Sequence, residues 1–369
     1  MIYRVIGLMS GSSMDGLDMA FVEFEEKAGA WSYNLRAAHC EAYPDEWAKK
    51  LQGATSLNSH DYLSLHIDYG HWLGQRVNEF IHRYQLEYQV QLISSHGHTT
   101  FHSPDLKLTA QLGDGAAIAA ETGIAVITDL RSMDVALGGQ GAPIVPIGEK
   151  LLWSNYDLFL NLGGIANLSA SAGISATGQW LAFDVCPANR VLNMIVARVG
   201  KLYDEDGILA ADGKLVPELF NNLNALDYYN KPYPKSLANE FGTGIVFPLV
   251  TNYDMSTEDG LFTYAEHIAE QVAVAVSGAT DKAKRTAKTA RMLITGGGAF
   301  NLHLVKRLTE KMTALGVEVE VPNAELISYK EAVVMALMGV LRWRDEVNAM
   351  ASVTGAEKDT VNGAIWKGE

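Results

Sequence analysis

The sequence predicts an α/β protein built from two domains of related topology, with a ligand-binding cleft between them. Its 369 residues are enough for two domains, each with its own core. The two halves also repeat one order of elements: a strand, a glycine-rich hairpin, two further strands, helices and another strand. The change from one half to the other falls near residue 140. We therefore expect one domain from residues 1–140 with 350–369, and a second from residues 141–349.

The first half contains two kinds of pattern. Runs rich in β-branched and aromatic residues predict strands at 1–8, 17–24, 31–40, 90–95 and 124–128. The first two of these strands are joined by a polar, glycine-containing turn at 9–16. Apolar residues recur at helical spacing elsewhere, which predicts helices within 45–86 and at 114–122.

The second half repeats this organisation. Apolar runs predict strands at 157–162, 168–172, 179–183, 291–295 and 317–321. A glycine-rich turn at 163–167 joins the first two. Helices are predicted after Pro187 and at 262–279, 302–315 and 329–344, and core positions in the last of these are expected for Met335, Met338 and Trp343.

Composition excludes some functions and predicts a compartment. The formal charge of −14 argues against a broad nucleic-acid surface, which needs clustered Lys and Arg. Two distant cysteines, Cys40 and Cys186, have no metal or redox spacing, which is typical of a reducing compartment. The start of the chain lacks a secretory pattern, and no apolar run is long enough to span a membrane. We therefore expect a cytoplasmic protein without a membrane partner.

Three glycine-rich segments each follow an apolar strand, at 7–16, 161–167 and 296–298. None has the spacing of a P-loop or of the dinucleotide fingerprint, and one such segment alone is usually a tight turn. Two are hairpins with small polar residues, Ser12, Ser13 and Asn167, that suit a phosphate chain. The third opens a predicted helix with bare backbone, against which a nucleoside can lie. Together they predict a nucleotide held in the cleft.

Asp184 follows the apolar run 179–183 and precedes Pro187, which suits the first turn of a helix. It is therefore expected near the carboxyl end of a strand. Capping of the next helix is the commoner role for such an aspartate. A catalytic base is the alternative, because ligands bind at the carboxyl ends of strands in α/β folds.

The chain resembles one known family over almost its whole length. Its two halves and three glycine-rich segments are similar to the actin–hexokinase–Hsp70 superfamily of ATPases and sugar kinases, which have ribonuclease H-like, actin-like domains. Within it, the chain resembles the anhydro-N-acetylmuramic acid kinases. The segments that carry this resemblance are 7–18, 95–99, 111–115, 129–146, 161–168, 203–207, 234–236, 296–299 and 354–356. The chain departs from the usual pattern of this family at Ser12, His98, Cys186 and Ala188.

The resemblance implies a role for individual residues. It implies Asp184 as the catalytic base, with ATP and Mg²⁺ as cofactors and a homodimer as the assembly. The nucleotide-binding residues that it implies are Gly11, Ser12, Ser13, Met14, Asp15, Gly16, Leu17, Asp18, Gly163, Gly164, Asn167, Gly296, Gly297 and Gly298. Those implied for the substrate are His98, Thr99, Arg131, Asn189 and Glu331. Arg131 is expected to bind the lactyl carboxylate of the sugar.

Several of these residues also have simpler interpretations. Asp15 or Asp18 can orient Mg²⁺ through water, or can stabilise a turn. Arg131 can instead form an ion pair with Asp129 or Asp134. The close spacing of His96, His98 and His102 suggests a zinc site, but hydrogen bonding to a sugar or a structural role is favoured.

The main hypothesis is an ATP-dependent kinase acting on 1,6-anhydro-N-acetylmuramic acid. It would open the anhydro ring with water and phosphorylate O6, giving N-acetylmuramic acid 6-phosphate in the recycling of cell-wall sugars. An alternative is a kinase for another anhydro or amino sugar, because residues 98, 186 and 188 are unusual. A different class, a nucleotide-switched binding protein like Hsp70, has little room in this chain for a peptide-binding domain.

Overall fold

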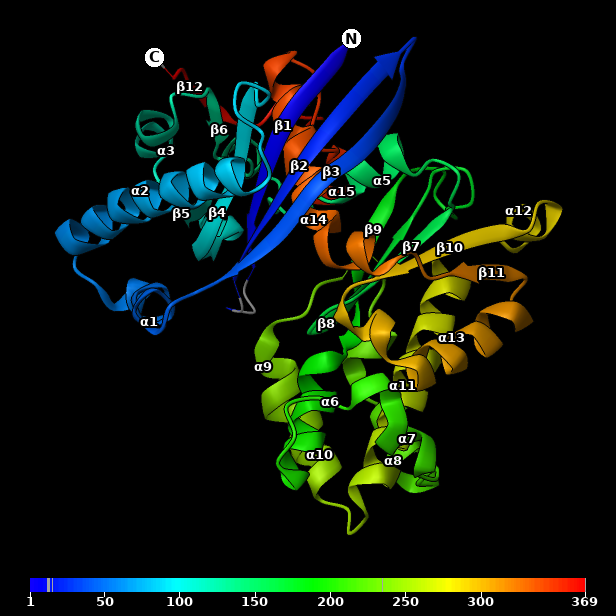
Figure 1. Ribbon diagram of the computed structural model, residues 1–369. Coiled ribbons are helices and arrows are strands. Elements are labelled where there is room, and N and C mark those ends of the chain that lie inside the picture. Colours follow the sequence, from blue (N-terminus) through cyan, green and yellow to red (C-terminus); the bar gives the residue numbers. More distant parts are fainter. Residues whose placement is uncertain (12–13, 15, 234, 369) are drawn as a thin grey trace. The chain divides into compact units, whose positions relative to one another are not determined.

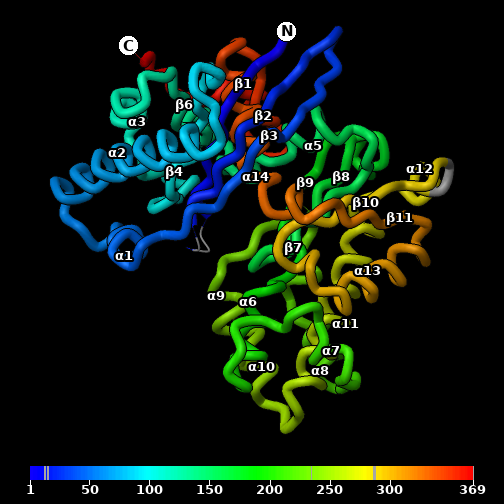
Figure 2. Tube along the Cα trace, viewed as in Figure 1, coloured from blue at the N-terminus to red at the C-terminus, as the bar shows by residue number. Residues whose placement is uncertain are grey.

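The computed structural model describes residues 1–11, 14, 16–233 and 235–368, and it divides into two units (Figures 1 and 2). Unit 1 consists of Met1–Trp153 with Tyr329–Glu369, and unit 2 of Ser154–Ser328. Unit 2 is therefore one continuous insertion into unit 1. The chain returns to unit 1 inside helix α14 (Ala324–Trp343).

The units depart from the predicted bounds, because residues 141–153 and 329–349 group with unit 1. Helix α5 (Pro146–Leu152) explains the difference. Its Glu149 forms a buried ion pair of 2.6 Å with Lys330 of α14. Directly after α5, the indole N–H of Trp153 donates to the hydroxyl of Tyr33 at 3.0 Å.

Unit 1 is organised around a sheet with the strand order β12-β6-β4-β1-β2-β3, and β5 pairs with β4 at one side. β1 pairs antiparallel with β2 and parallel with β4, which is itself parallel to β6. The strands are β1 (Ile2–Ser10), β2 (Gly16–Lys27), β3 (Ala30–Ala42), β4 (Leu92–Ser103), β5 (Leu108–Leu112), β6 (Val126–Thr128) and β12 (Ala364–Trp366).

Helices cover this sheet. The buried face of α2 carries Tyr69, Leu73 and Val77 at the predicted helical spacing. On α14, a Cβ on Gly7 would meet the carbonyl oxygen of Ala332 at 2.0 Å, so only glycine lets α14 lie this close to β1. Besides α5 and α14, the helices of unit 1 are α1 (Asp45–Gly53), α2 (Ser59–Arg83), α3 (Gly115–Thr122), α4 (Ser132–Ala136) and α15 (Ala351–Thr354), with single 3₁₀ turns at Ala54–Ser56 and Pro104–Leu106.

Unit 2 has a five-stranded sheet with the order β9-β8-β7-β10-β11. In each unit, three consecutive strands pair antiparallel, and a further strand pairs parallel with the first of the three. The prediction that the two domains have related topology is therefore confirmed. The strands are β7 (Leu158–Leu162), β8 (Ile165–Ala170), β9 (Leu181–Pro187), β10 (Ala290–Thr295) and β11 (Val317–Glu320).

The helices of unit 2 enclose its core. The longest, α11, is capped by Ser256, whose side chain accepts from the N–H of Asp259. The helices are α6 (Asn189–Val196), α7 (Ile208–Asp212), α8 (Pro217–Asn224), α9 (Asn239–Phe241), α10 (Phe247–Thr251), α11 (Thr257–Ala279), α12 (Lys282–Ala287) and α13 (Leu302–Ala314). Short 3₁₀ or π turns lie at Ala197–Val199, Glu205–Gly207, Asp227–Asn230, Gly242–Val246 and Gly297–Phe300.

Of the predicted strands, β4 and β9 extend furthest beyond their predicted ends. β4 runs on through Thr99 to Ser103, because β5 supplies a partner for residues 98–103. β9 runs on to Pro187, which therefore ends a strand instead of opening a helix. Met335 and Met338 lie in the core as expected, whereas Trp343 at the end of α14 is 46% exposed.

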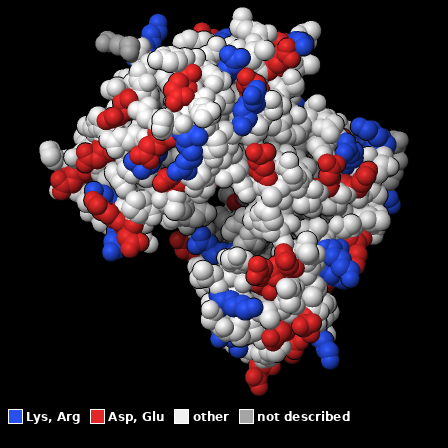
Figure 3. Space-filling view, in the orientation of Figure 1, with Lys and Arg blue, Asp and Glu red and all other residues white. Residues whose placement is uncertain are grey.

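The distribution of surface charge agrees with the expectation that the protein has no broad basic surface. On the face drawn in Figure 3, acidic and basic side chains are interspersed. Among the residues that the structure describes, no helix is long and apolar enough to cross a membrane. The predicted cleft between the domains stays a prediction.

Candidate active site

Asp184 was expected near the carboxyl end of a strand but lies in the middle of β9, because this strand continues to Pro187; the residue is half-buried. One carboxylate oxygen accepts from the side-chain amide of Asn167, and the other accepts from the backbone N–H of Leu237 at 2.7 Å. Burial raises the pKa of this carboxyl, while the two hydrogen bonds oppose the shift. Helix α6 begins five residues later, after Ala188, with no side-chain cap. The capping interpretation is therefore wrong, and the carboxylate is oriented by its neighbours.

The segment after Asp227 holds Asp184 in place. The backbone N–H of Asp184 donates to the carbonyl of Lys235, and the hydroxyl of Tyr228 donates to the carbonyl of Asp184. The ammonium of Lys235 lies 4.6 Å from the ring centre of Tyr228 and 4.9 Å from that of Tyr233. This cation–π packing fixes the segment that presents Leu237 to the carboxylate. Lys235 lies within the resemblance segment 234–236 but was assigned no role from the sequence, although aromatic residues closely precede it.

The two unusual residues near Asp184, Cys186 and Ala188, are completely buried in the core of unit 2. Burial raises the pKa of the Cys186 thiol, so it stays protonated. Neither side chain reaches the surface, although the Cys186 thiol lies close enough to Asp184 for the carboxylate charge to act on it.

The β7–β8 hairpin has glycines that the fold of unit 2 does not require. A Cβ on Gly163 or Gly164 would find only ordinary contacts, the nearest at 3.4 Å and 3.7 Å, and neither residue has a positive φ. The hairpin's carbonyl groups accept from the backbone N–H groups of Ala188 and Asn189. Asn167 turns its amide towards Asp184. The bare backbone of Gly163 and Gly164 is what a phosphate group needs to approach closely.

The Gly296–Gly298 turn is only partly explained by packing. Gly296 has a φ of +81°, and a Cβ on Gly298 would lie 2.7 Å from Cβ of Leu162. Gly297 differs, because its Cβ would meet only the amide nitrogen of Asn189 at 3.6 Å. Asn189 itself donates to the carbonyl of Leu162 at 2.8 Å, which places it beside this turn. Gly297 is thus free to face a ligand.

In unit 1, Arg131 contacts His96 instead of a carboxylate. Its Nε–H donates to Nε2 of His96 at 2.8 Å, and an Nη–H donates to the carbonyl of Gly141 at 2.6 Å. The carboxylate of Asp134 accepts from Thr354 and from the N–H of Gly141, and Asp129 accepts from Thr128. Neither aspartate forms an ion pair with Arg131, so that alternative is wrong.

Electrostatics links Arg131 to Glu331 of α14. Burial lowers the pKa of the Arg131 guanidinium to about 10, opposed by the charges of Glu331 and Asp134. Burial also raises the pKa of Glu331, opposed by the charges of Lys330 and Arg131. The buried guanidinium of Arg131 and the buried carboxyl of Glu331 can together bind a polar ligand.

The histidines of β4 have separate partners. His96 Nδ1 bonds the carbonyl of Gly97, His98 Nδ1 bonds Ser10 Oγ at 3.0 Å, and His102 Nδ1 bonds Thr109. Thr99 is exposed beside them. Within the described ranges, no three His, Cys, Asp or Glu side chains are placed to hold a metal ion. The zinc interpretation therefore has no support in the described geometry.

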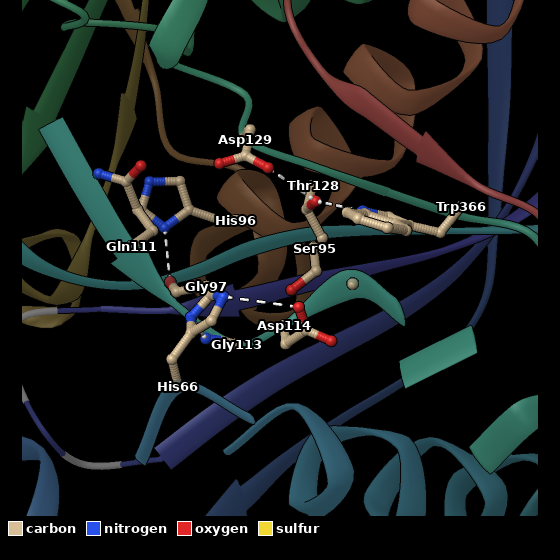
Figure 4. Close-up of a pocket in the computed structure, with 11 residues that line it drawn as sticks. His66, Ser95, His96, Gly97, Gln111, Gly113, Asp114, Thr128, Asp129 and Trp366 are labelled. Atoms are coloured by element: carbon tan, nitrogen blue, oxygen red, sulfur yellow. Dashed lines mark hydrogen bonds and ion pairs between the residues drawn. The ribbon is translucent and has the colours of Figure 1, made fainter. Parts of the chain in front are cut away.

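A small polar cavity lies behind His96 (Figure 4). Its volume of about 40 Å³ has room for two or three water molecules but not for a sugar. The hydroxyl of Ser95 and the amide oxygen of Gln111 line it and have no protein partner among the described residues. Water there would satisfy both, as is usual for buried polar groups. The cavity adjoins His96, the partner of Arg131, and its size and polar lining suit water.

The first hairpin is described only in part. Ser12, Ser13 and Asp15 lie outside the described residues. Met14 has a φ of +61°, and a Cβ on Gly16 would lie 2.6 Å from the carbonyl oxygen of Glu41. The side chain of Leu17 is in the core, so only its backbone can face a nucleotide. Gly11 and Asp18 flank the hairpin at the ends of β1 and β2.

Comparison with known proteins identifies relatives along the whole chain. A family model described as anhydro-N-acetylmuramic acid kinase matches residues 3–368. The anhydro-N-acetylmuramic acid kinase of Shewanella sediminis is 31% identical, with 98% of each chain covered. That of Vibrio parahaemolyticus is 32% identical, covering 98% of this chain and 97% of its own. A solved structure, component A of (R)-2-hydroxyglutaryl-CoA dehydratase from Acidaminococcus fermentans, covers 91% of this chain and 97% of its own at 15% identity. Its TM-score of 0.44 is too low to support a conclusion.

Proposed function

Because this chain belongs to the anhydro-N-acetylmuramic acid kinase family, we propose that it is an ATP-dependent sugar kinase. It opens 1,6-anhydro-N-acetylmuramic acid with water and phosphorylates O6, giving N-acetylmuramic acid 6-phosphate in the recycling of cell-wall sugars. The observation that supports this most directly is Asp184, a half-buried carboxylate oriented by Asn167 and Leu237. An oriented carboxylate whose pKa is raised suits a general base.

The base acts on water. Asp184 accepts a proton from the water molecule that attacks the anomeric carbon, and a new C1–O bond forms as the C1–O6 bond breaks. O6 then carries the negative charge and takes the γ-phosphoryl group from ATP, which leaves ADP. The net reaction converts sugar, water and ATP into the 6-phosphate, ADP and one proton, which Asp184 releases to solvent. The remaining catalysis consists of positioning and charge stabilisation.

The nucleotide is held by bare backbone. We assign the phosphates to Gly163 and Gly164, and to the first hairpin with Gly11, Ser12, Ser13 and Gly16. The nucleoside is assigned to the turn around Gly297. These assignments fit because Gly163, Gly164 and Gly297 have space for a Cβ and no positive φ. Mg²⁺ bound with ATP neutralises phosphate charge, and Asp15 or Asp18 would reach it through water.

The sugar is assigned to polar residues of unit 1. Arg131 is fixed by His96 and Gly141 and would bind the lactyl carboxylate with its remaining N–H groups. His98, Thr99 and Glu331 would bind other polar groups, and Asn189 would support the turn next to Gly297. We further propose a homodimer, as the resemblance implies, and a cytoplasmic location, as the composition predicts.

Release of ADP tests the proposal. ADP is measured with ATP and Mg²⁺, alone and with 1,6-anhydro-N-acetylmuramic acid, other anhydro sugars and ordinary amino sugars. A kinase for this sugar is strongly stimulated by it and less by the others. Stimulation by a different sugar would support the alternative kinase. Equal ADP release with and without every sugar would exclude both, and would favour a nucleotide-switched binding protein.

A further inference from the structure

A chain of hydrogen bonds in unit 1 ends at His98. The hydroxyls of Tyr69 and Tyr43 are 2.7 Å apart, and the hydroxyl of Tyr43 lies 2.6 Å from Ser10 Oγ. Ser10 Oγ in turn lies 3.0 Å from Nδ1 of His98. Ser10 ends β1, and it pairs with His98 in the neighbouring strand β4. The proposed chemistry of the sugar kinase does not use Tyr43, Tyr69 or Ser10.

The donor-to-acceptor direction of this series of hydrogen bonds follows from counting hydroxyl protons. Each hydroxyl has one proton to donate, and burial raises the pKa of both Tyr43 and Tyr69, so both stay protonated. Tyr69 is completely buried, and its hydroxyl has a short, well-aligned hydrogen bond only with Tyr43 among the described residues, while Ser10 Oγ is a weaker neighbour. If the hydrogen bonds ran outward from His98, the proton of Tyr69 would have no well-aligned acceptor among the described residues. The series therefore runs inward, from Tyr69 to Tyr43, to Ser10 and to His98 Nδ1.

An imidazole that accepts at Nδ1 carries its proton at Nε2. The only hydrogen bond of the His98 ring to described residues is the one at Nδ1. His98 keeps 7% of its surface exposed, and Nε2 is not among the sealed-off polar atoms of the described chain. The Nε2–H group is therefore a hydrogen-bond donor with no partner among the described residues. His96, on the same strand, has the opposite arrangement, because its Nε2 accepts from Arg131.

We propose that Tyr69, Tyr43 and Ser10 lock His98 in the Nε2–H tautomer, so that it is a fixed, neutral donor to a carbonyl oxygen of the sugar. The sugar contact rests on the proposed function. A neutral donor suits the neutral acetamido carbonyl, whereas the charged Arg131 suits the carboxylate. A fixed donor also discriminates against ligands that present a donor at the same place. Ser10, Tyr43 and Tyr69 are positioning residues for this donor.

Nuclear magnetic resonance of the whole protein tests the tautomer directly. Long-range ¹H–¹⁵N correlation on protein labelled in its ten histidines separates Nδ1–H from Nε2–H rings. His98→Gln identifies the signals of His98 by their loss. We expect a pure Nε2–H tautomer in the parent and a detectable Nδ1–H form in Ser10→Ala. Tyr62→Phe is the matched control, because its hydroxyl bonds Thr100 at 2.6 Å and is outside the chain. A parent ring in the Nδ1–H or charged form, or an unchanged ring in Ser10→Ala, would overturn the lock.

Kinetics tests the contact with the sugar. Ser10→Ala should raise KM for the sugar roughly 2- to 10-fold, as for one weakened hydrogen bond, with little change in kcat. A glutamine amide always carries N–H groups, so Ser10→Ala should raise KM much less in a His98→Gln background. Equal effects of Ser10→Ala in both backgrounds would overturn the donor role. If no sugar is turned over, the proposed function and the sugar contact both fail, while the resonance result still decides the tautomer lock.

Discussion

Asp184 is the residue whose role is easiest to separate from its contribution to folding. An amide in place of the carboxylate keeps the shape and can still accept from Leu237, but it cannot take a proton from water. We expect Asp184→Asn to lower kcat by roughly 10²- to 10⁴-fold, with ATP affinity and melting temperature close to those of the parent. Asp157→Asn is the control, because Asp157 accepts from the backbone N–H of Arg291 and has no proposed catalytic role. A variant of Asp184 that turns over at the parent rate would disprove the catalytic role.

The protonation of Asp184 should also appear in the pH profile. Because burial raises the pKa of this carboxyl, its working, deprotonated form is lost at a higher pH than for an ordinary aspartate. We expect kcat/KM to fall as the pH is lowered, with the midpoint above the usual aspartate value. The residual activity of Asp184→Asn should lack this acidic decline. A midpoint at or below the ordinary value would argue for a different base.

Single residues show how far sequence reasoning extends. The position of Asp184 beside glycine-rich turns was predictable, but its partner Leu237 is 53 residues away and acts through its backbone. His96 was considered as a metal ligand, yet it is the partner of Arg131, 35 residues further on. Such pairings depend on how strands align, and no local pattern encodes them.

At the scale of elements, the buried ion pair between Glu149 of α5 and Lys330 of α14 invites a test. Both side chains are about 95% buried, so removing one leaves an uncompensated charge in the interior. We expect Lys330→Met to lower the free energy of unfolding by about 3–5 kcal/mol, and Glu149→Leu with Lys330→Met to restore most of it. The control is Lys311→Met, since its pair with Glu270 is partly exposed and should contribute less than about 1 kcal/mol. Equal effects of the two single variants in denaturant unfolding would contradict the interpretation.

The Gly296–Gly298 turn offers a second test at this scale. Gly297→Val leaves the fold intact, because the space for its Cβ is open, but the side chain should obstruct a nucleoside and weaken ATP binding. Gly298→Val should instead lower the melting temperature, because its Cβ would clash with Leu162. Calorimetric ATP titration and thermal unfolding of both variants distinguish the two effects. Unchanged ATP affinity in folded Gly297→Val would show that this turn does not bind the nucleotide.

Elements with a strong local pattern were predicted well, and those made by distant partners were not. The β1–β2 hairpin and helix α11 are recognisable from apolar runs and spacing. The extension of β4 beyond Ser95 was missed because polar residues 96–103 become a strand only when β5 pairs with them. β12, with three residues near the end of the chain, exists because β6 offers it an edge.

For the whole molecule, repetition in the sequence was enough to predict two related sheets, but not where the chain passes between them. Helix α14 looks like one continuous apolar helix, and only its packing shows that residues from Tyr329 onward belong to unit 1. The buried approach of Ala332 to Gly7 and the pair between Glu149 and Lys330 set this division. Neither contact has a signature in the local sequence.

This division predicts which parts of the chain fold alone. All five strands of the second sheet, and a core whose buried members run from Leu158 to Ile327, lie within the insertion 154–328. We therefore expect residues 154–328, expressed alone, to unfold cooperatively in calorimetry, because a domain with its own core is stable by itself. Residues 1–153 alone should not, because they lack α14 beyond residue 328, which covers β1, and the strand β12 that pairs with β6. Adding residues 329–369 through a short flexible linker should restore cooperative unfolding to that fragment. Gradual melting of 154–328, or cooperative melting of 1–153 alone, would show that the units are not independent in this way.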